Sequence, residues 1–306
     1  MSQSEQNDGR EMRCGYVALV GRPNVGKSTL LNHLLRQKLA ITSRKPQTTR
    51  HVMLGVDTEG PDQAIYVDTP GIHEHADREM NRRMVRSATA VLTDVDLIVM
   101  VLDRDQWTRE DELVLSHVKR SGTPVLAVIV VINKVDQIRK KELLLPVIDR
   151  LSRLDCFAAI IPVSALKGLG LDVLRAEVFA RLPHHAHLFP PDQVTDQTEK
   201  FIVSEIIREK LMRRMGDEIP HRTAVVIEQF AQTDDRVDIA ADIYVERPGQ
   251  KRIIIGKGGE KLKLIGQEAR KDIEALLDRP VMLRLWVKVR PGWTNSDAAL
   301  RRMGYD

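Results

Sequence analysis

The chain has 306 residues, more than one typical hydrophobic core accommodates, so its length favours two domains. Its 47 Lys and Arg residues against 43 Asp and Glu residues give a formal net charge of +4, which fits an anionic partner but does not require one. The two cysteines, Cys14 and Cys156, are far apart and have no His or Cys neighbours at metal-ligand spacing, which argues against a disulfide framework and a zinc site.

The N-terminal segment, residues 1–10, lacks the basic-then-apolar order of a signal peptide. No apolar run in the sequence approaches the roughly 18 residues of a membrane span. We therefore expect a cytosolic protein.

In the first part of the chain, apolar and β-branched runs alternate with stretches of helical spacing. The runs are residues 16–20, 64–68, 96–103, 124–134 and 158–164, and the helical stretches include 27–39 and 110–122. Strands that alternate with helices predict an α/β domain with a mostly parallel sheet and helices on both faces. Such a sheet binds ligands at the carboxyl ends of its strands.

The second part of the chain has a different pattern. We place a first domain at residues 12–183, a linker rich in Pro, His and short polar residues at 184–198, and a smaller α+β domain at 199–306. Its predicted elements are a helix over 198–216, a hairpin of strands 224–232 and 237–246, a strand, glycine turn and helix over 251–277, and a strand over 281–290.

A glycine-rich loop follows the first apolar run. It contains the pattern GxxxxGK[ST] in the strand-loop-helix context that a phosphate-binding loop requires; a plain glycine turn is the alternative. Glycines let successive N–H groups converge on a phosphate chain, the lysine reaches the β- and γ-phosphates, and the serine hydroxyl binds Mg²⁺. The residues predicted to bind nucleotide are Gly21, Arg22, Pro23, Asn24, Val25, Gly26, Lys27, Ser28 and Thr29.

A second motif, DTPGI, ends the next apolar run. We predict that Asp68 holds Mg²⁺ through water and that the Gly71 N–H faces the γ-phosphate. Taken alone, this sequence is a turn about as often as a site. The predicted contact residues are Asp68, Thr69, Pro70, Gly71 and Ile72.

A third motif, NKVD, indicates the base. Asn133 can pair with the O6 and N7 edge of guanine, Lys134 can lie along the ring, and the Asp136 carboxylate can accept from N1–H and the 2-amino group. Adenine lacks both donors, so the predicted ligand is GTP or GDP. The tripeptide SAL adds a backbone N–H near O6, although it is weak evidence alone. The predicted contacts are Asn133, Lys134, Val135, Asp136, Ser164, Ala165 and Leu166.

In this order, these segments and the intervening ITSRKPQTTRH resemble the G domain of the Era family, the bacterial ribosome-assembly GTPases of the TRAFAC class. The resemblance implies that Thr48 and Thr49 lie in switch I and that Thr49 closes on Mg²⁺ and the γ-phosphate. A solvated threonine pair in a basic loop is the alternative. We assign the metal to Ser28, Thr49 and Asp68, and catalysis to Lys27, Thr49 and Asn24.

Hydrolysis is expected to be slow, because Ile72 stands where a small signalling GTPase carries a water-orienting glutamine. In relatives of Era, an asparagine at the position of Asn24 binds a potassium ion that replaces an arginine finger. Stabilisation of the turn is the alternative role for Asn24. His73 and His75 lie in a polar loop and are expected to be exposed to solvent rather than to act as bases.

The segment IIIGKGGEKLK in the second domain has the form of a nucleic-acid-binding GxxG turn. Residues 247–290 hold twelve Lys or Arg against five Asp or Glu, so positive charge concentrates around the turn. A lone GxxG turn is weak evidence and a basic helix face can simply be solvated, but together they predict RNA binding. The predicted RNA-binding residues are Gly256, Lys257, Gly258, Gly259, Lys261 and Lys263.

This half resembles the type II KH domain of the Era family, including WVKVRPGW near its end. The resemblance implies binding to the 3′ end of 16S ribosomal RNA and the small (30S) ribosomal subunit, and peripheral association with the inner membrane. We expect a monomer. The amphipathic LMRRM, residues 211–215, is equally explained by core packing. Trp286 is expected in the core rather than on a base-stacking surface.

These features predict a GTP-hydrolysing switch whose nucleotide state controls the docking of an RNA-binding domain. One alternative is an RNA-binding structural assembly factor that holds GTP with negligible turnover. A tRNA-modifying GTPase of the same superfamily is another, and it would need a separate catalytic domain.

Overall fold

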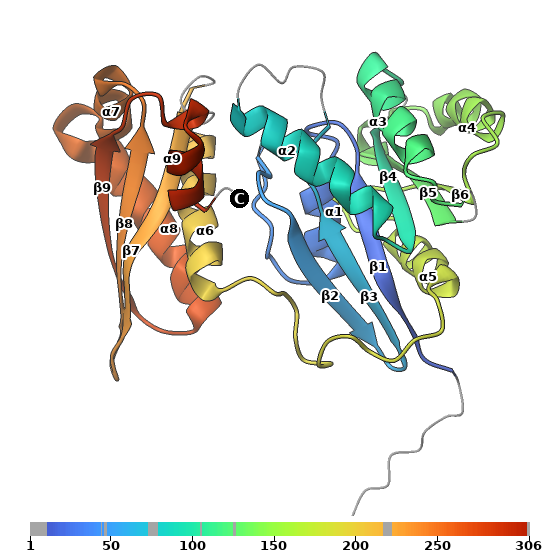
Figure 1. The fold of residues 1–306 in the computed structure, drawn as a ribbon, viewed down its shortest axis with the longest axis horizontal. Helices are drawn as coiled ribbons and strands as arrows, with labels where there is room; N and C mark the ends of the chain where they lie inside the picture. Colours follow the sequence, from blue (N-terminus) through green and yellow to red (C-terminus); the bar gives the residue numbers. More distant parts are fainter. Residues whose placement is uncertain are drawn as a thin grey trace, which may run out of the picture.

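The structure, a computed structural model, describes residues 11–43, 45, 48–72, 79–104, 106–124, 127–216 and 222–304. Figure 1 shows two bodies side by side, a larger α/β domain and a smaller domain, connected by a long segment between α5 and α6. The strands of the first domain are β1 (Arg13–Val20), β2 (Met53–Glu59), β3 (Asp62–Asp68), β4 (Leu97–Asp103), β5 (Val128–Asn133) and β6 (Ala159–Pro162). Its helices include α1 (Lys27–Leu34), α2 (Glu79–Ala90), α3 (Arg109–Arg120), α4 (Leu144–Ser152) and α5 (Leu171–Arg181).

The sheet of the first domain has the strand order β2-β3-β1-β4-β5-β6. Neighbouring strands pair in parallel except β2, which runs antiparallel to β3 at the edge. The predicted mostly parallel α/β fold is therefore confirmed. Strand β2 is absent from the prediction because Gly55 and Asp57 interrupt its apolar pattern.

Both faces of this sheet are covered, which explains why its strands are apolar without alternation. In β4, Leu97, Val99 and Val101 point into the core formed with α1 and α5. The intervening residues of β4 point into a second core, formed with α2, α3 and α4. Because all strands of the parallel part end at one edge, the loops after β1, β3, β4, β5 and β6 meet there.

The second domain has a three-stranded sheet in the order β7-β8-β9. Strands β7 and β8 form the predicted antiparallel hairpin around residues 233–236, and β8 and β9 are parallel. Helices α6 and α8 pack against this sheet. The bounds are α6 (Glu199–Arg214), β7 (Thr223–Gln232), β8 (Val237–Val245), α7 (Pro248–Ile255), α8 (Glu260–Leu277), β9 (Val281–Val289) and α9 (Asp297–Arg302).

Two sequence-based expectations for this domain are wrong. Residues 251–255 belong to helix α7 and not to a strand, because Pro248 occupies the first turn and the Gln250 side chain accepts the backbone N–H groups of Glu246 and Arg247, each at 2.9 Å. Trp286 is 48% exposed and lies outside the core. In β9 the odd-numbered residues face the helices, so an even-numbered residue points outward.

Helix α6 packs its apolar residues into the domain core. Leu211, Met212 and Met215 are buried, which supports core packing as the reason for the amphipathic LMRRM segment. Within the parts of the chain that the structure describes, every helix falls short of the length and apolarity needed to cross a bilayer.

Candidate functional site

The loop between β1 and α1 has the conformation that its glycines permit. Gly21 and Gly26 have φ angles of 154° and 103°. A Cβ atom on Gly26 would lie 2.3 Å from Asn133 Nδ2, and one on Gly21 would lie 2.5 Å from the Val101 carbonyl oxygen. Any larger residue would therefore push the loop away from the ends of β4 and β5. The loop leads into the N-terminus of α1 at Lys27, where the free N–H groups of the first turn favour an anion.

Lys27 has its ammonium group inside this loop. Its Nζ donates to the Gly21 carbonyl at 2.9 Å and to the Arg22 carbonyl at 3.1 Å, and the residue is only 5% exposed. Burial lowers the pKa of Lys27 to about 8. Phosphate oxygens beside the ammonium would favour its charged form, so the environment suits an anionic ligand.

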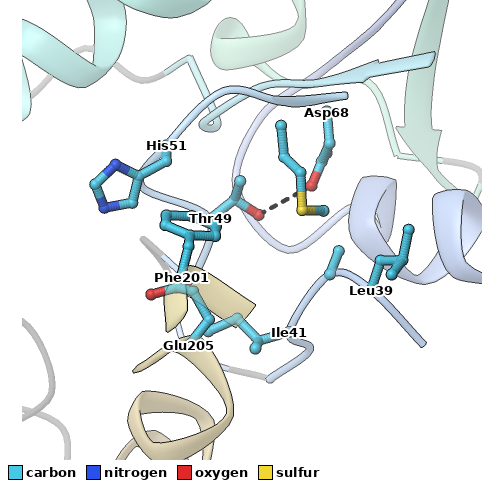
Figure 2. A pocket seen from close by; sticks show the side chains of 9 residues that line it. Leu39, Ile41, Thr49, His51, Asp68, Phe201 and Glu205 are labelled. Carbon is cyan, nitrogen blue, oxygen red and sulfur yellow. Dashed lines mark hydrogen bonds between the residues drawn. The ribbon is translucent and has the colours of Figure 1, made fainter. Parts of the chain in front are cut away.

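Three oxygen-bearing side chains converge next to the loop. Ser28 Oγ lies 2.7 Å from Thr49 Oγ1 and 2.7 Å from Asp68 Oδ2, and Thr49 Oγ1 lies 3.4 Å from the same carboxylate oxygen, as Figure 2 shows for Thr49 and Asp68. The other oxygen of Asp68, Oδ1, is buried and finds no hydrogen-bond partner among the described residues. Burial raises the pKa of Asp68 to about 6. A hard set of hydroxyl and carboxylate oxygens with one unsatisfied atom fits Mg²⁺.

The remaining residues of DTPGI support the loop. Thr69 Oγ1 donates to the Leu19 carbonyl at 2.8 Å, and a Cβ on Gly71 would lie 2.7 Å from the Pro23 nitrogen. Ile72 is fully buried in the core beneath, so its side chain is not available to orient water. His73 and His75 lie outside the described residues.

Asn133 joins two loops of the site. Its Nδ2 donates to the Val25 carbonyl at 2.8 Å, and its Oδ1 accepts from the Ala165 N–H at 2.9 Å. At 2% exposure, the side chain holds the phosphate loop against the SAL segment. The pairing of Asn133 with the edge of a guanine base stays a prediction.

The predicted base-reading carboxylate, Asp136, is exposed at the same edge of the sheet. Its Oδ1 accepts a hydrogen bond from Ser164 Oγ at 2.5 Å, which fixes the carboxylate next to the SAL loop. Leu166 of that loop is 63% exposed. The structure thus brings three separate sequence motifs, at residues 21–29, 133–136 and 164–166, to one side of the sheet.

Lys134 connects the NKVD loop, residues 133–136, to the phosphate loop. Its Nζ donates to the Asn24 carbonyl at 2.7 Å and to Asp103 Oδ2 at 2.9 Å. Asp103 was missed by the sequence analysis. The sequence does give one sign of its role: Asp103 is the last residue of the apolar run that precedes the run carrying NKVD.

The second domain contacts the segment that contains Thr49. Arg208 of α6 is 1% exposed; its guanidinium binds both carboxylate oxygens of Glu205, at 2.7 and 2.6 Å, and donates to the Thr48 carbonyl. Glu209, also buried, accepts from the Thr42 N–H at 3.0 Å and from Lys38 Nζ at 2.8 Å. These residues were missed as well, because nothing local in a helix indicates that its charged residues face another domain.

A small cavity of about 20 Å³ lies between the two domains, lined by residues of the first domain that include Thr49 and His51 and by Phe201 and Glu205 of α6. Figure 2 shows Phe201 and Glu205 of α6 facing Thr49 and His51 across it. The rings of His51 and Phe201 meet edge to face with centroids 5.2 Å apart. The cavity is too small for a nucleotide, and it marks the contact between Thr49 and the second domain.

The predicted RNA-binding turn lies between α7 and α8. Gly256, Gly258 and Gly259 have φ angles of 74°, 60° and 84°, which favour glycine at all three positions. The three predicted lysines of this region are exposed. Beside the turn, a groove of about 400 Å³ runs between α8 and β9, and its walls combine apolar and basic side chains. Its lining residues are Gly259, Leu262, Lys263, Gly266, Gln267, Arg270, Met282, Leu283 and Leu285.

Two protein-family models match the chain. Residues 16–134 match the family described as 50S ribosome-binding GTPase, and residues 218–294 match the KH domain family. GTPase Era of Ectopseudomonas mendocina is 55% identical over 293 residues, which cover 96% of this chain and 97% of that protein. GTPase Era of Marinobacter nauticus is 53% identical over 304 residues, 99% of each chain.

Solved structures of Era proteins have the same fold. A single-substitution variant of Aquifex aeolicus Era, bound to GDP and AlF4⁻, superimposes with a TM-score of 0.92 at 41% identity, covering 96% of this chain and 99% of that one. An Era structure in complex with MgGDPNP and nucleotides 1506–1542 of 16S ribosomal RNA gives the same values. Full-length similarity together with the phosphate loop and the KH-type domain shows that the chain belongs to the Era family of GTPases.

Proposed function

We propose that the chain is a GTP-hydrolysing switch that binds the 3′ end of 16S ribosomal RNA and acts in assembly of the small ribosomal subunit. The related Era of the solved complex holds MgGDPNP and 16S nucleotides 1506–1542 in one protein, and it is 41% identical to this chain. In this proposal residues 12–183 bind and hydrolyse GTP, residues 184–198 link the domains, and residues 199–306 bind RNA.

The observation that best supports a nucleotide-dependent switch is the position of Thr49 between the two domains. On one side Thr49 Oγ1 contacts Ser28 and Asp68, the proposed metal-binding residues. On the other side, the preceding carbonyl, that of Thr48, accepts a hydrogen bond from Arg208 of α6. A ligand that moves Thr49 therefore disturbs the contact with the second domain, and movement of the second domain disturbs Thr49.

In the proposed mechanism, the backbone N–H groups of residues 21–28 surround the phosphates and Lys27 neutralises charge on the β- and γ-phosphates. Ser28, Asp68 and Thr49 would hold Mg²⁺, which when bound neutralises charge that develops on the phosphates. Thr49 reports whether a γ-phosphate is present. Asp136 selects guanine through the two donors that adenine lacks.

Slow turnover follows from the residue after DTPG. Ile72 is apolar and buried, so it contributes no hydrogen bond to an attacking water. Without a water-orienting glutamine or a supplied arginine, turnover is expected about 10³- to 10⁵-fold below that of an assisted GTPase. We propose that Asn24 holds a potassium ion that supplies the missing positive charge. Its φ of 64° also fits a role in the turn.

The RNA-binding part of the proposal is supported by the turn and the groove. Gly258 and Gly259 have open space where a side chain would lie, so a phosphate chain can approach the backbone there, and the groove beside them offers apolar walls for bases. Exposed lysines nearby add attraction to phosphate that weakens with salt. Binding to the whole 30S subunit, a monomeric state and peripheral association with the inner membrane are further predictions, and they rest on the family resemblance.

GTPase measurements in KCl and in NaCl, with and without single-stranded RNA carrying the 16S 3′ sequence, test the proposal. We expect the RNA to accelerate hydrolysis in KCl and the Asn24→Gly variant, which retains the turn, to lose the difference between the salts. If GTP binds but neither salt nor RNA changes a negligible rate, the chain is instead an RNA-binding assembly factor that holds GTP without using it.

A further inference from the structure

Asp103 lies where the phosphate loop and the base-reading loop meet. It is the last residue of β4, and in the sheet it pairs with Asn133, the last residue of β5. Its carboxylate is 10% exposed. A carboxylate at this depth is stable as an anion only when cations and hydrogen-bond donors surround it.

Basic side chains surround this carboxylate. Asp103 Oδ2 accepts from Lys134 Nζ at 2.9 Å and lies 3.9 Å from Arg22 Nη2, and Oδ1 accepts from Arg104 Nε at 2.9 Å. Burial alone would raise the pKa of Asp103, but the hydrogen bonds from Lys134 and Arg104 outweigh it and hold the pKa below its usual value. The carboxylate is therefore ionised at neutral pH and is part of the site's charge distribution.

Lys134 needs such a partner to hold its position. Its backbone is in the left-handed region, with φ of 63°, and its ammonium group also donates to the Asn24 carbonyl at 2.7 Å. The lysine side chain is flexible, so one carbonyl acceptor alone leaves it several alternative rotamers. With one acceptor from the phosphate loop and one from the end of β4, the ammonium group is held in place and the aliphatic part of the side chain has a single conformation.

We propose that Asp103 is a positioning residue for guanine-nucleotide binding, which acts by holding Lys134 across the gap between the phosphate loop and the NKVD loop. The inference rests on the proposed nucleotide site. It adds to that site a carboxylate that would act through Lys134, by setting the position of the lysine side chain beside the base and the spacing of the two loops.

The test is a double-mutant cycle with Asp103→Asn and Lys134→Ala, with the GDP dissociation constant and dissociation rate of the full chain as readouts. Asparagine retains the size of the side chain and removes its charge. We expect Asp103→Asn to weaken GDP binding by about tenfold, through faster dissociation, because a charge-assisted hydrogen bond is lost. In the Lys134→Ala background the same substitution should change affinity by less than about twofold, because residues that act as a unit are not additive.

Arg104→Ala is the matched control, since it removes a different partner of the same carboxylate, and GDP affinity should change little. The melting temperature of each variant without nucleotide checks that it is folded, so that a loss of GDP affinity is not a loss of the fold. Equal GDP affinity in Asp103→Asn, or an equal loss with and without Lys134, would overturn the inference. Failure of the unaltered chain to bind GDP would instead overturn the proposed function.

Discussion

At the scale of single residues, the proposed specificity for guanine rests on Asp136. Its carboxylate is exposed beside the SAL loop and is oriented by Ser164 Oγ at 2.5 Å. The change Asp136→Asn replaces one acceptor oxygen with an amide donor, so the side chain then complements a base that offers a carbonyl in place of the 2-amino group. We expect preference to shift from GTP to xanthosine triphosphate by about 10²-fold or more.

Competition binding with the two nucleotides measures this shift. Asp149→Asn is a suitable control, because Asp149 is an exposed carboxylate of α4 that pairs with Arg153. An unchanged preference in Asp136→Asn would remove the argument that this residue reads the base.

At the scale of elements, Arg208 of α6 contacts the segment that contains Thr48 and Thr49, which we call the switch segment after its proposed role. Arg208→Lys retains the charge, but a single ammonium group cannot bind Glu205 with two hydrogen bonds and reach the Thr48 carbonyl as the guanidinium does. We expect hydrolysis of bound GTP to slow by about tenfold, because Thr49 loses its support, while GDP affinity changes little.

Single-turnover hydrolysis and GDP titration separate these two quantities. Arg214→Lys is the matched control, since Arg214 is on the same helix and pairs with Glu268 inside the second domain. Equal hydrolysis rates in the Arg208→Lys variant and the unaltered chain would show that α6 does not support the switch segment.

The turn between α7 and α8 provides the corresponding test for RNA. A side chain at Gly258 meets no atom within 4 Å, but its φ of 60° strains any other residue. We expect Gly258→Asp to weaken binding of the 16S 3′ sequence by about tenfold or more without changing GTP affinity, because it places negative charge where phosphates are proposed to bind. Gly258→Ala is the control, because it introduces the strain without the charge. Similar RNA affinity in Gly258→Asp and the unaltered chain would reject the turn as the site.

The elements also show which parts of the structure can be predicted from sequence. The loops proposed to bind nucleotide can be predicted, because each is a short contiguous segment whose glycines and polar residues are needed for the conformation and contacts of that segment itself. Helix α7 was predicted as a strand because IIIG has no period long enough to distinguish the two. The outward direction of Trp286 and the contact of Arg208 with Thr48, 160 residues away in sequence, depend on tertiary packing and leave no local signal.

At the scale of the whole molecule, the described residues include two groups of contacts between the second domain and the first. One joins α6 to Lys38, Thr42 and Thr48. The other is an apolar cluster in which Met80 and Met84 of α2 pack with Trp293, Leu300 and Met303 near the end of the chain. Helix α2 follows DTPGI, so the segment that contains Thr49 and the helix after DTPGI both contact the second domain.

Trp293 can report on this second contact, because it is fully buried in the cluster. The chain has two other tryptophans, Trp107 and Trp286, and replacing both with Phe isolates its fluorescence. We expect emission at short wavelength with a non-hydrolysable GTP analogue and a shift to longer wavelength with GDP, since release of the switch segments would let water reach the indole. Met84→Asp, which places a charge in the cluster, should give the long-wavelength spectrum with either nucleotide. Identical spectra with both nucleotides in the chain that retains Met84 would mean that the domains do not separate at this contact when GTP is hydrolysed.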